Sequence, residues 1–300
     1  TDPKVMHLSL PYVQWMLAGS PLLFVYIIYT SILRGVGDST TPLLALALTS
    51  VIGVIITPIL LKGYFGFPAL GIIAPAIASI ISYIAILIFL AIYLNKKKHP
   101  LRPNRQLLQH IRHNSALSKI ILRLGVPTGI QMITTSMAGL VIVGLVNRFG
   151  AHATAAYGAV NQVLNYIQFP AISISIAASI FAAQAIGAGK SDLLARVTRT
   201  ALGMNFLFTG ALIALGYLFS KYLMALFITD PTVVVLGQQL LFIVLWAILF
   251  FGAGAIFASI MRASGTVTVP MLINISAILF IEMPCAYWFS SMWGLKGIWV

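Results

Sequence analysis

Four polar residues recur at helical spacing in an otherwise apolar run: Tyr157, Asn161, Asn165 and Gln168. Positions i, i+4, i+8 and i+11 lie on one face of a helix, so these side chains form a single stripe. An amide inside a membrane helix must face protein or water. The stripe therefore either bonds to a neighbouring helix or lines a polar path across the membrane, and the residue types leave both interpretations open.

A single acid lies inside another apolar run, Glu282 in "LFIEMPCAYWF". A charged side chain at the centre of a membrane helix costs roughly 2.5–3.5 kcal/mol on insertion scales, so an acid there is a candidate functional group. A carboxyl group that binds and releases a proton could couple transport to a proton gradient. The alternative is a Glu that is paired locally or faces the membrane interface.

Two other patterns predict no enzyme chemistry. "GAGKS" (187–191) resembles the end of a phosphate-binding loop, but Gln184 stands where that motif begins with Gly, and an apolar run precedes it. The histidines of a basic segment are expected to be solvated loop residues: His99, His110 and His113. We therefore expect no catalytic site, no cofactor and no metal site.

The composition indicates the elements that position these residues. Of 300 residues, 60% are hydrophobic and 8% are charged, whereas a soluble domain has about 25% charged residues. Crossing a bilayer takes about 20 helical residues, and the apolar runs are too long and unalternating for barrel strands. We predict an all-α, polytopic membrane protein with eight spans and the start of a ninth at "GLKGIWV" (294–300). The eight spans are 11–33, 42–62, 69–94, 120–147, 154–186, 198–220, 232–261 and 268–291.

The net charge of +13 is distributed unevenly between the two sides of the membrane. With the gaps between spans numbered alternately, thirteen Lys and Arg fall on one side and five on the other, and the basic stretch 95–118 belongs to the richer side. Lys and Arg accumulate on the cytoplasmic side, so 95–118 is predicted to be a cytoplasmic linker. The alternative role for this stretch is binding of anionic lipid head groups. Nucleic acid is not an expected partner.

An internal repeat runs through the chain at an offset of 228 residues. "TDPKV" (1–5) matches "TDPTV" (229–233), and "LRGVGDSTTP" (33–42) matches "MRASGTVTVP" (261–270). With two residues of slippage, "ALGII" (69–73) matches "LKGIW" (295–299). Ser31 also aligns with Ser259. Four ordered matches at nearly one spacing predict two related copies.

The repeat also predicts a domain organisation. Three spans precede the second "TDP" within its copy, so we expect three more before residue 1 and one more after residue 300. Six spans per copy give a parallel repeat, with a substrate path between two lobes. The expected parts are half of an N-terminal lobe (1–94), the linker (95–118) and a C-terminal lobe (119–300).

These motifs resemble the multidrug and toxic compound extrusion (MATE) transporters over essentially the whole chain. The resemblance rests on the paired segments 33–42 and 261–270, on "LRLGVPTGIQM" (122–132), and on the segment that begins "RFGAHATAAYGAVNQV" and ends at residue 190. It implies a two-lobe, twelve-helix exporter of cationic or amphipathic compounds, working by alternating access. In that scheme the chain holds helices four to eleven and the start of the twelfth.

The resemblance implies a substrate cavity and a coupling cation. Many members carry acids where this chain has Thr135 and Phe251, so a sodium site at these positions is not expected, and H⁺ is favoured over Na⁺. Pro170 bends its helix and is the expected hinge, and Glu282 is the candidate for ion coupling. The residues expected to line the cavity are Gln131, Thr135, Tyr157, Asn161, Asn165, Gln168 and Phe251.

Two other functions remain open at this point. A flippase for lipid-linked saccharides has a related fold, but it would carry several basic residues inside its spans, and this chain has almost none. A polytopic structural or receptor protein is the other alternative. We expect a monomer in the cell membrane, in contact with lipid and with small amphipathic substrates.

Overall fold

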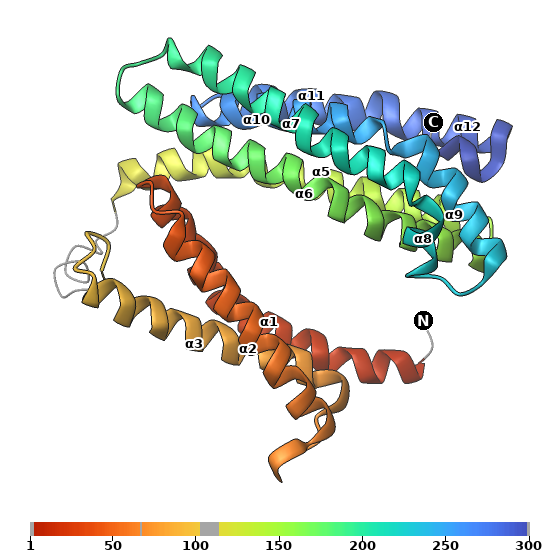
Figure 1. Ribbon diagram of the computed structural model, residues 1–300, viewed down its shortest axis with the longest axis horizontal. Helices are drawn as coiled ribbons and strands as arrows, with labels where there is room; N and C mark the ends of the chain where they lie inside the picture. The colour runs from red at the N-terminus through yellow and green to blue at the C-terminus, as the bar shows by residue number, and fades with distance from the viewer. Residues whose placement is uncertain (1–2, 67, 103–113, 299–300) are drawn as a thin grey trace. The chain divides into compact units, whose positions relative to one another are not determined.

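The computed structural model describes residues 3–66, 68–102 and 114–298, and these residues form helices joined by short turns, with no strand among them. The chain divides into two compact units, residues 1–113 and 114–300 (Figure 1). Three predicted features lie partly outside the described residues: the first "TDP", the end of "GLKGIWV", and the linker segment that contains His110 and His113.

Unit 1 is a bundle of three long helices: α1 (Pro3–Gly35), α2 (Thr40–Lys62) and α3 (Ala74–Lys96), with the short 3₁₀ turns η1 (Tyr64–Gly66) and η2 (Gly71–Ile73) before α3. Leu33, Ile86 and Leu90 are fully buried where α1 and α3 meet. Leu60 of α2 and Ala74 of α3 form a second cluster near the η turns. The apolar core therefore holds all three helices together.

Unit 2 is built around α6, the longest helix. Its elements are α5 (Ser115–Asn147), α6 (Ala151–Gly187), α7 (Leu193–Leu218), α8 (Ser220–Ala225), α9 (Pro231–Val244), α10 (Ala247–Ala263), α11 (Thr268–Ala277), η3 (Ile278–Glu282), α12 (Met283–Trp293) and η4 (Gly294–Ile298). One face of α6, from Ala156 to Ile167, packs against α7, α8 and α9. A second cluster joins α5, α12 and η4 at the α5–α6 turn. Unit 2 therefore has a core of its own.

Seven of the described helical segments are long and apolar enough to cross a membrane, and the pair α9–α10 makes an eighth if it forms one bent span. Many large apolar side chains stay exposed, among them Val54, Phe208 and Phe280. Exposed apolar side chains are typical of helices whose solvent is lipid, where each helix satisfies its own backbone groups. The prediction of an all-α polytopic membrane protein is confirmed.

The internal repeat is visible in the backbone at the two matched motifs. Gly37 and Gly265, which align in the repeat, both adopt left-handed φ values, 91° and 83°. After α1, Asp38 N bonds Leu33 O at 3.0 Å; after α10, Thr266 N bonds Met261 O, also at 3.0 Å. Both helices thus end in the same glycine-dependent capping motif, so the weak sequence match corresponds to one structural device used twice.

The predicted span 232–261 is not one straight helix. It breaks between α9 and α10 with a bend of 47°, and across the break Ile248 N and Leu249 N bond carbonyls only three residues back. At this break Tyr217 of α7 donates a 3.0 Å hydrogen bond from its Oη to the Phe242 carbonyl oxygen. In a continuous helix that carbonyl would accept from Trp246 N, so the Tyr217 side chain takes the place of a backbone donor. A side chain inserted into the hydrogen-bond ladder is a known cause of sharp kinks. The predicted span therefore consists of two helices, and it counts as one span only as a bent pair.

The last predicted span also contains irregular geometry. Its middle, η3, is a single π-helical turn that ends at Glu282. Helix α12 ends just before Gly294, whose φ is 62°. The turn η4 then packs back against α12, and Gly297 lies beside the backbone of Phe289. Residues 294–298, where we expected a ninth span to start, form a 3₁₀ turn, as do the matching residues of η2 in unit 1.

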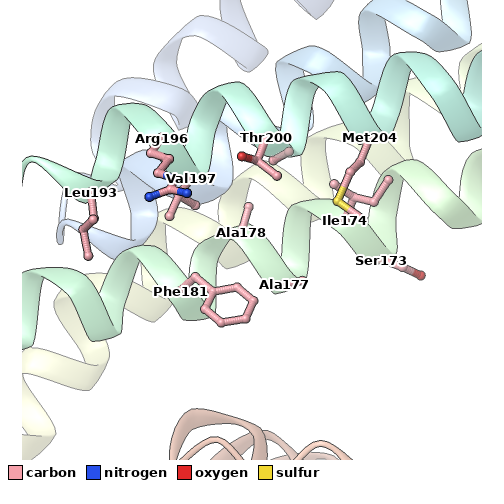
Figure 2. Close-up of a pocket in the computed structure, with 11 residues that line it drawn as sticks. Ser173, Ile174, Ala177, Ala178, Phe181, Leu193, Arg196, Val197, Thr200 and Met204 are labelled. Carbon is pink, nitrogen blue, oxygen red and sulfur yellow. The ribbon is translucent and has the colours of Figure 1, made fainter.

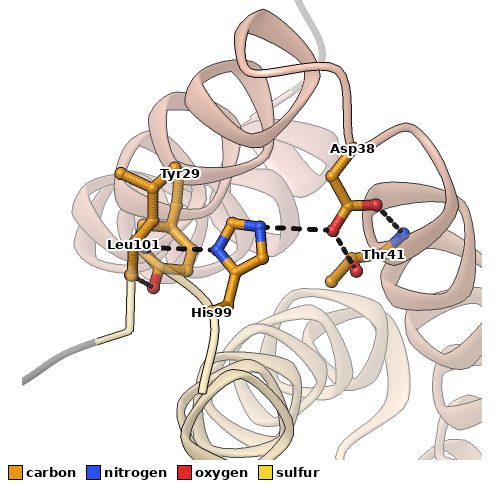
Figure 3. A network of polar contacts seen from close by, with 5 residues as sticks. All are labelled: Tyr29, Asp38, Thr41, His99 and Leu101. Carbon is orange, nitrogen blue, oxygen red and sulfur yellow. Dashed lines mark hydrogen bonds and ion pairs between the residues drawn. The ribbon is translucent and has the colours of Figure 1, made fainter. Parts of the chain in front are cut away.

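A network of polar contacts fastens the start of the basic linker to the α1–α2 corner (Figure 3). His99 Nε2 lies 3.8 Å from Asp38 Oδ2, and His99 Nδ1 accepts a 3.1 Å hydrogen bond from Leu101 N. Tyr29 Oη donates to Leu101 O at 2.6 Å. His99 is half-buried, so the prediction of a solvated loop residue was wrong for it. Apolar spacing carries no signal for such a contact between turns.

Asp38 also caps α2, and its replacement tests that role. Asp38 Oδ1 accepts from Thr41 N at 3.0 Å and Oδ2 from Thr41 Oγ1 at 2.6 Å. We expect Asp38→Ala to lower the free energy of unfolding of the detergent-solubilised chain by about 1 kcal/mol at pH 7, the usual cost of losing a cap. Chemical denaturation followed by circular dichroism measures this.

The effect of Asp38→Ala should depend on pH. Burial raises the pKa of Asp38, but the hydrogen bonds from Thr41 and the nearby His99 outweigh it, so the pKa lies below its ordinary range. A depressed folded-state pKa means that the carboxylate stabilises the fold above its unfolded pKa of about 3.9. The difference from the parent should shrink as the pH falls through the lower, folded-state pKa. A difference that stays constant down to pH 2 would contradict this role. Asp38→Asn, which keeps a cap acceptor, is the matched control.

Candidate functional site

A cluster of polar side chains joins α5 to α10 and α11 inside unit 2. Arg262 Nη1, in the last turn of α10, donates to Gln131 Oε1 of α5 at 3.3 Å. One turn along α5, Thr135 Oγ1 lies 3.3 Å from Asn274 Oδ1 of α11 and 3.0 Å from Gln131 O. Arg262 and Asn274 are half-buried and Thr135 is exposed. We call these four residues the α5 cluster.

The predicted polar stripe of α6 flanks the buried face of that helix. Asn161 and Gln168 are half-buried and Asn165 is exposed. Tyr157 packs against the apolar side chains of α5, α12 and η4 at the α5–α6 turn, which are not part of the α5 cluster. The hydrogen bonds within the described residues join none of Asn161, Asn165 and Gln168 to the α5 cluster. The stripe and the cluster are therefore two separate polar surfaces of unit 2.

The two polar surfaces nevertheless lie at similar depths. By the helical rise of about 1.5 Å per residue, Gln131 and Gln168 both lie roughly 25 Å from the turn that joins α5 to α6. Thr135 and Asn161 lie roughly 15–18 Å from the same turn. Polar groups on neighbouring antiparallel helices thus occupy one layer of the membrane.

Three other predicted site residues lie elsewhere in unit 2. Phe251 is exposed on α10. Pro170 is half-buried within α6, whose helical bounds continue through it. Glu282, the last residue of the π turn η3, has an exposed side chain. π turns occur often at functional sites because they aim a side chain differently from the rest of the helix.

Sequence reasoning missed a fully buried polar residue, Asn205 of α7. Its Nδ2 donates to Leu249 O of α10 at 3.2 Å, and its Oδ1 accepts from Thr209 Oγ1 at 3.1 Å. Gly252 packs directly against the same amide. The sequence did contain a signal for Asn205 and Asn274, because each is an Asn within an apolar run. A buried amide must find hydrogen-bond partners, so such an Asn indicates a polar contact with another helix. Asn205 ties α7 to α10 close to the α9–α10 break.

The chemistry that this arrangement offers is recognition rather than catalysis. The described residues include no group of three or more His, Cys, Asp and Glu side chains that could hold a metal ion. The α5 cluster and the α6 stripe offer amides, hydroxyls and one guanidinium group, and Glu282 adds a carboxyl group. These groups can bind polar parts of an otherwise apolar molecule.

The contact between Arg262 and Gln131 can be measured by a double-mutant cycle. A hydrogen bond to a charged group contributes about 1.5–3 kcal/mol, so we expect Arg262→Met and Gln131→Leu to show a coupling free energy of about 1.5 kcal/mol in unfolding. A coupling near zero would show that the contact between Arg262 and Gln131 does not stabilise the fold. Arg199→Met, an exposed cation of α7, combined with Gln131→Leu is the control and should show no coupling.

Comparison with known proteins identifies the family. The MatE family model matches residues 1–59 and 127–288. This chain belongs to the MatE family. Among curated proteins, the probable multidrug resistance protein YoeA of Bacillus subtilis is 43% identical over 302 residues, an alignment that covers 100% of this chain and 65% of YoeA. An FAD transporter of Shewanella oneidensis is 26% identical and is covered over 63% of its length.

Solved structures show the same MATE fold. The outward-facing structure of a multidrug resistance MATE family transporter matches with a TM-score of 0.89 at 20% identity, covering 100% of this chain and 66% of that one. The predicted MATE-type fold is confirmed, and the chain is an integral membrane protein. It spans about two thirds of the length of the curated relatives it matches. The predicted cavity, hinge and coupling residues remain predictions.

Proposed function

We propose that this chain forms part of a secondary-active exporter of cationic or amphipathic compounds that exchanges them for protons by alternating access of two lobes. The observation that supports this most strongly is the layer of polar groups inside the spans of unit 2, formed by the α5 cluster and the α6 stripe. The relative YoeA, named a probable multidrug resistance protein, supports the same class of activity.

In this proposal the polar layer borders the path of the substrate. Amides and hydroxyls spaced along α5 and α6 provide several weak contacts instead of one strong site, which suits varied amphipathic molecules. Exposed aromatic side chains such as Phe251 and Phe257 of α10 add apolar surface. The predicted cavity residues Gln131, Thr135, Asn161, Asn165 and Gln168 are the contacts that we assign to it.

Proton coupling is proposed in preference to sodium coupling. A Na⁺ site wants several oxygen ligands, including carboxylates, whereas only one of the five acids of the sequence, Glu282, lies in a predicted span. A single carboxyl group can still bind and release a proton. We therefore assign ion coupling to Glu282. Separately, we place the basic linker 95–118 on the cytoplasmic side of the membrane, because Lys and Arg accumulate there.

A second candidate substrate class is an anionic aromatic molecule such as a flavin nucleotide. Arg262 places one cation beside the amides of the α5 cluster, and one relative is named an FAD transporter. A lipid-linked saccharide flippase is less well supported, because it needs several cations within its spans to meet phosphate.

The deciding experiment is transport by purified protein in proteoliposomes with an imposed pH gradient. Uptake of a fluorescent organic cation is compared with uptake of FAD, each with and without a proton ionophore. We expect cation transport that the ionophore abolishes and that added Na⁺ does not restore. Transport of FAD alone would favour the second candidate. Transport that depends on Na⁺ but not on pH would overturn proton coupling.

A further inference from the structure

A groove runs between the second half of α6 and the first half of α7 (Figure 2). Its volume is about 590 Å³, and its walls are almost entirely apolar, with small residues such as Ala177 and Ala178 along α6. Leu193 and Arg196 mark one end, and Ser173 and Met204 mark the other. The groove lies wholly within unit 2 and contains none of the residues assigned to the polar layer.

The length of the groove corresponds to one leaflet of a bilayer. From Leu193 to Met204 the helical rise of α7 gives roughly 17 Å, and half of a hydrocarbon core is about 15 Å. Because the candidate span of α7 begins at Leu193, we place the start of the groove at the membrane surface and its end near the midplane. A single acyl chain fits such a channel from end to end.

The entrance of the groove is positively charged. Arg196 is part of the lining, and Figure 2 shows its guanidinium group on the α7 side of the groove. Between residues 190 and 199 the charged residues are Lys190, Asp192, Arg196 and Arg199, which leaves a net positive charge. This charge disfavours a cationic substrate and favours an anionic head group at the level of the membrane surface.

From this geometry we propose that the α6–α7 groove binds an anionic phospholipid of the cytoplasmic leaflet. One acyl chain fills the groove down to Met204, and the phosphate of the head group pairs with Arg196 at the entrance. The leaflet follows from the basic side to which Arg196 belongs. The site is separate from the proposed transport path, so a failure of the transport experiment does not affect it.

The test is native mass spectrometry of the purified protein with added phosphatidylglycerol, compared with phosphatidylcholine that carries the same acyl chains. We expect the parent protein to retain phosphatidylglycerol in preference. Arg196→Gln should weaken this retention about fivefold, the contribution of one basic residue near an anionic surface. Arg196→Lys should keep most of it. Ala177→Phe, at an exposed position that should leave the helix packing intact, fills the groove and should prevent retention of either lipid.

The control variant is Arg199→Gln, which removes the same charge from an exposed residue outside the groove. Its retention of phosphatidylglycerol should change less than twofold. Equal losses in Arg196→Gln and Arg199→Gln would overturn the proposal in favour of general surface attraction. Equal retention of the two lipids by the parent, or unchanged retention in Ala177→Phe, would also overturn it. Unchanged melting temperatures of the variants establish that each loss reflects binding.

Discussion

Glu282→Gln is expected to reduce proton-driven export on the order of tenfold or more, because an amide of the same shape cannot carry a proton. Glu282 is the only acid of the sequence within a predicted span, and it stands at the π turn η3 with its side chain exposed. Binding of the substrate itself should change little. Export of a fluorescent cation driven by a pH gradient measures the first effect, and equilibrium binding measures the second.

Two variants make the result for Glu282 decisive. Glu282→Asp keeps a titratable group and should retain part of the export activity. Asp192→Asn removes an exposed acid from the α6–α7 turn and should leave export unchanged. If Glu282→Gln exports at the parent rate with the same dependence on the gradient, Glu282 has no coupling role and the assignment fails.

Gly252→Val is expected to lower the free energy of unfolding by about 3 kcal/mol, the combined cost of overpacking and of a displaced buried hydrogen bond. A Cβ atom on Gly252 would overlap Asn205 Oδ1 and would lie 2.8 Å from Nδ2. The Asn205 side chain is fully buried and donates to Leu249 O, so it has no free space to move into. Chemical denaturation in detergent measures the loss.

The same helix offers a matched control for Gly252→Val. No atom lies within 4 Å of the position that a Cβ on Gly254 would take. Gly254→Val should therefore be close to neutral, since Val also has the higher helix propensity. Equal losses in the two variants would mean that helix α10 is sensitive to any β-branched residue, and that the contact with Asn205 is not the cause.

The helices and the repeat could be predicted because they depend on local sequence. Apolar runs longer than a bilayer is thick specify spanning helices, and the glycine at the end of each matched motif specifies a left-handed turn, as at Gly37 and Gly265. Gln131 and Thr135 were predicted to line one cavity with the α6 stripe, which stays a prediction; in the structure they contact Arg262 of α10 and Asn274 of α11. Their partners Arg262 and Asn274 could not be predicted, because the pairing depends on how α5 packs.

The α9–α10 break shows most clearly what a sequence alone does not reveal. No proline lies at residues 245–246, and the kink is instead held by Tyr217, a side chain of another helix. His99 was misjudged for the same reason, since its partner Asp38 lies on a turn more than sixty residues earlier in the chain. The bend between α9 and α10 and the burial of His99 both depend on contacts between distant segments. The spacing of hydrophobic residues does not predict such contacts.

The break also bears on how the two copies of the repeat have diverged. Its counterpart in the first copy is α1, which contains Pro11 and Pro21 and still runs as one helix from Pro3 to Gly35. The copy without those prolines is the one that bends. If the copies arose by duplication of one ancestral segment, they have since acquired different shapes. Exchanging the two segments between lobes would then transplant a bend without the Tyr217 contact that holds it, so the halves are no longer interchangeable parts.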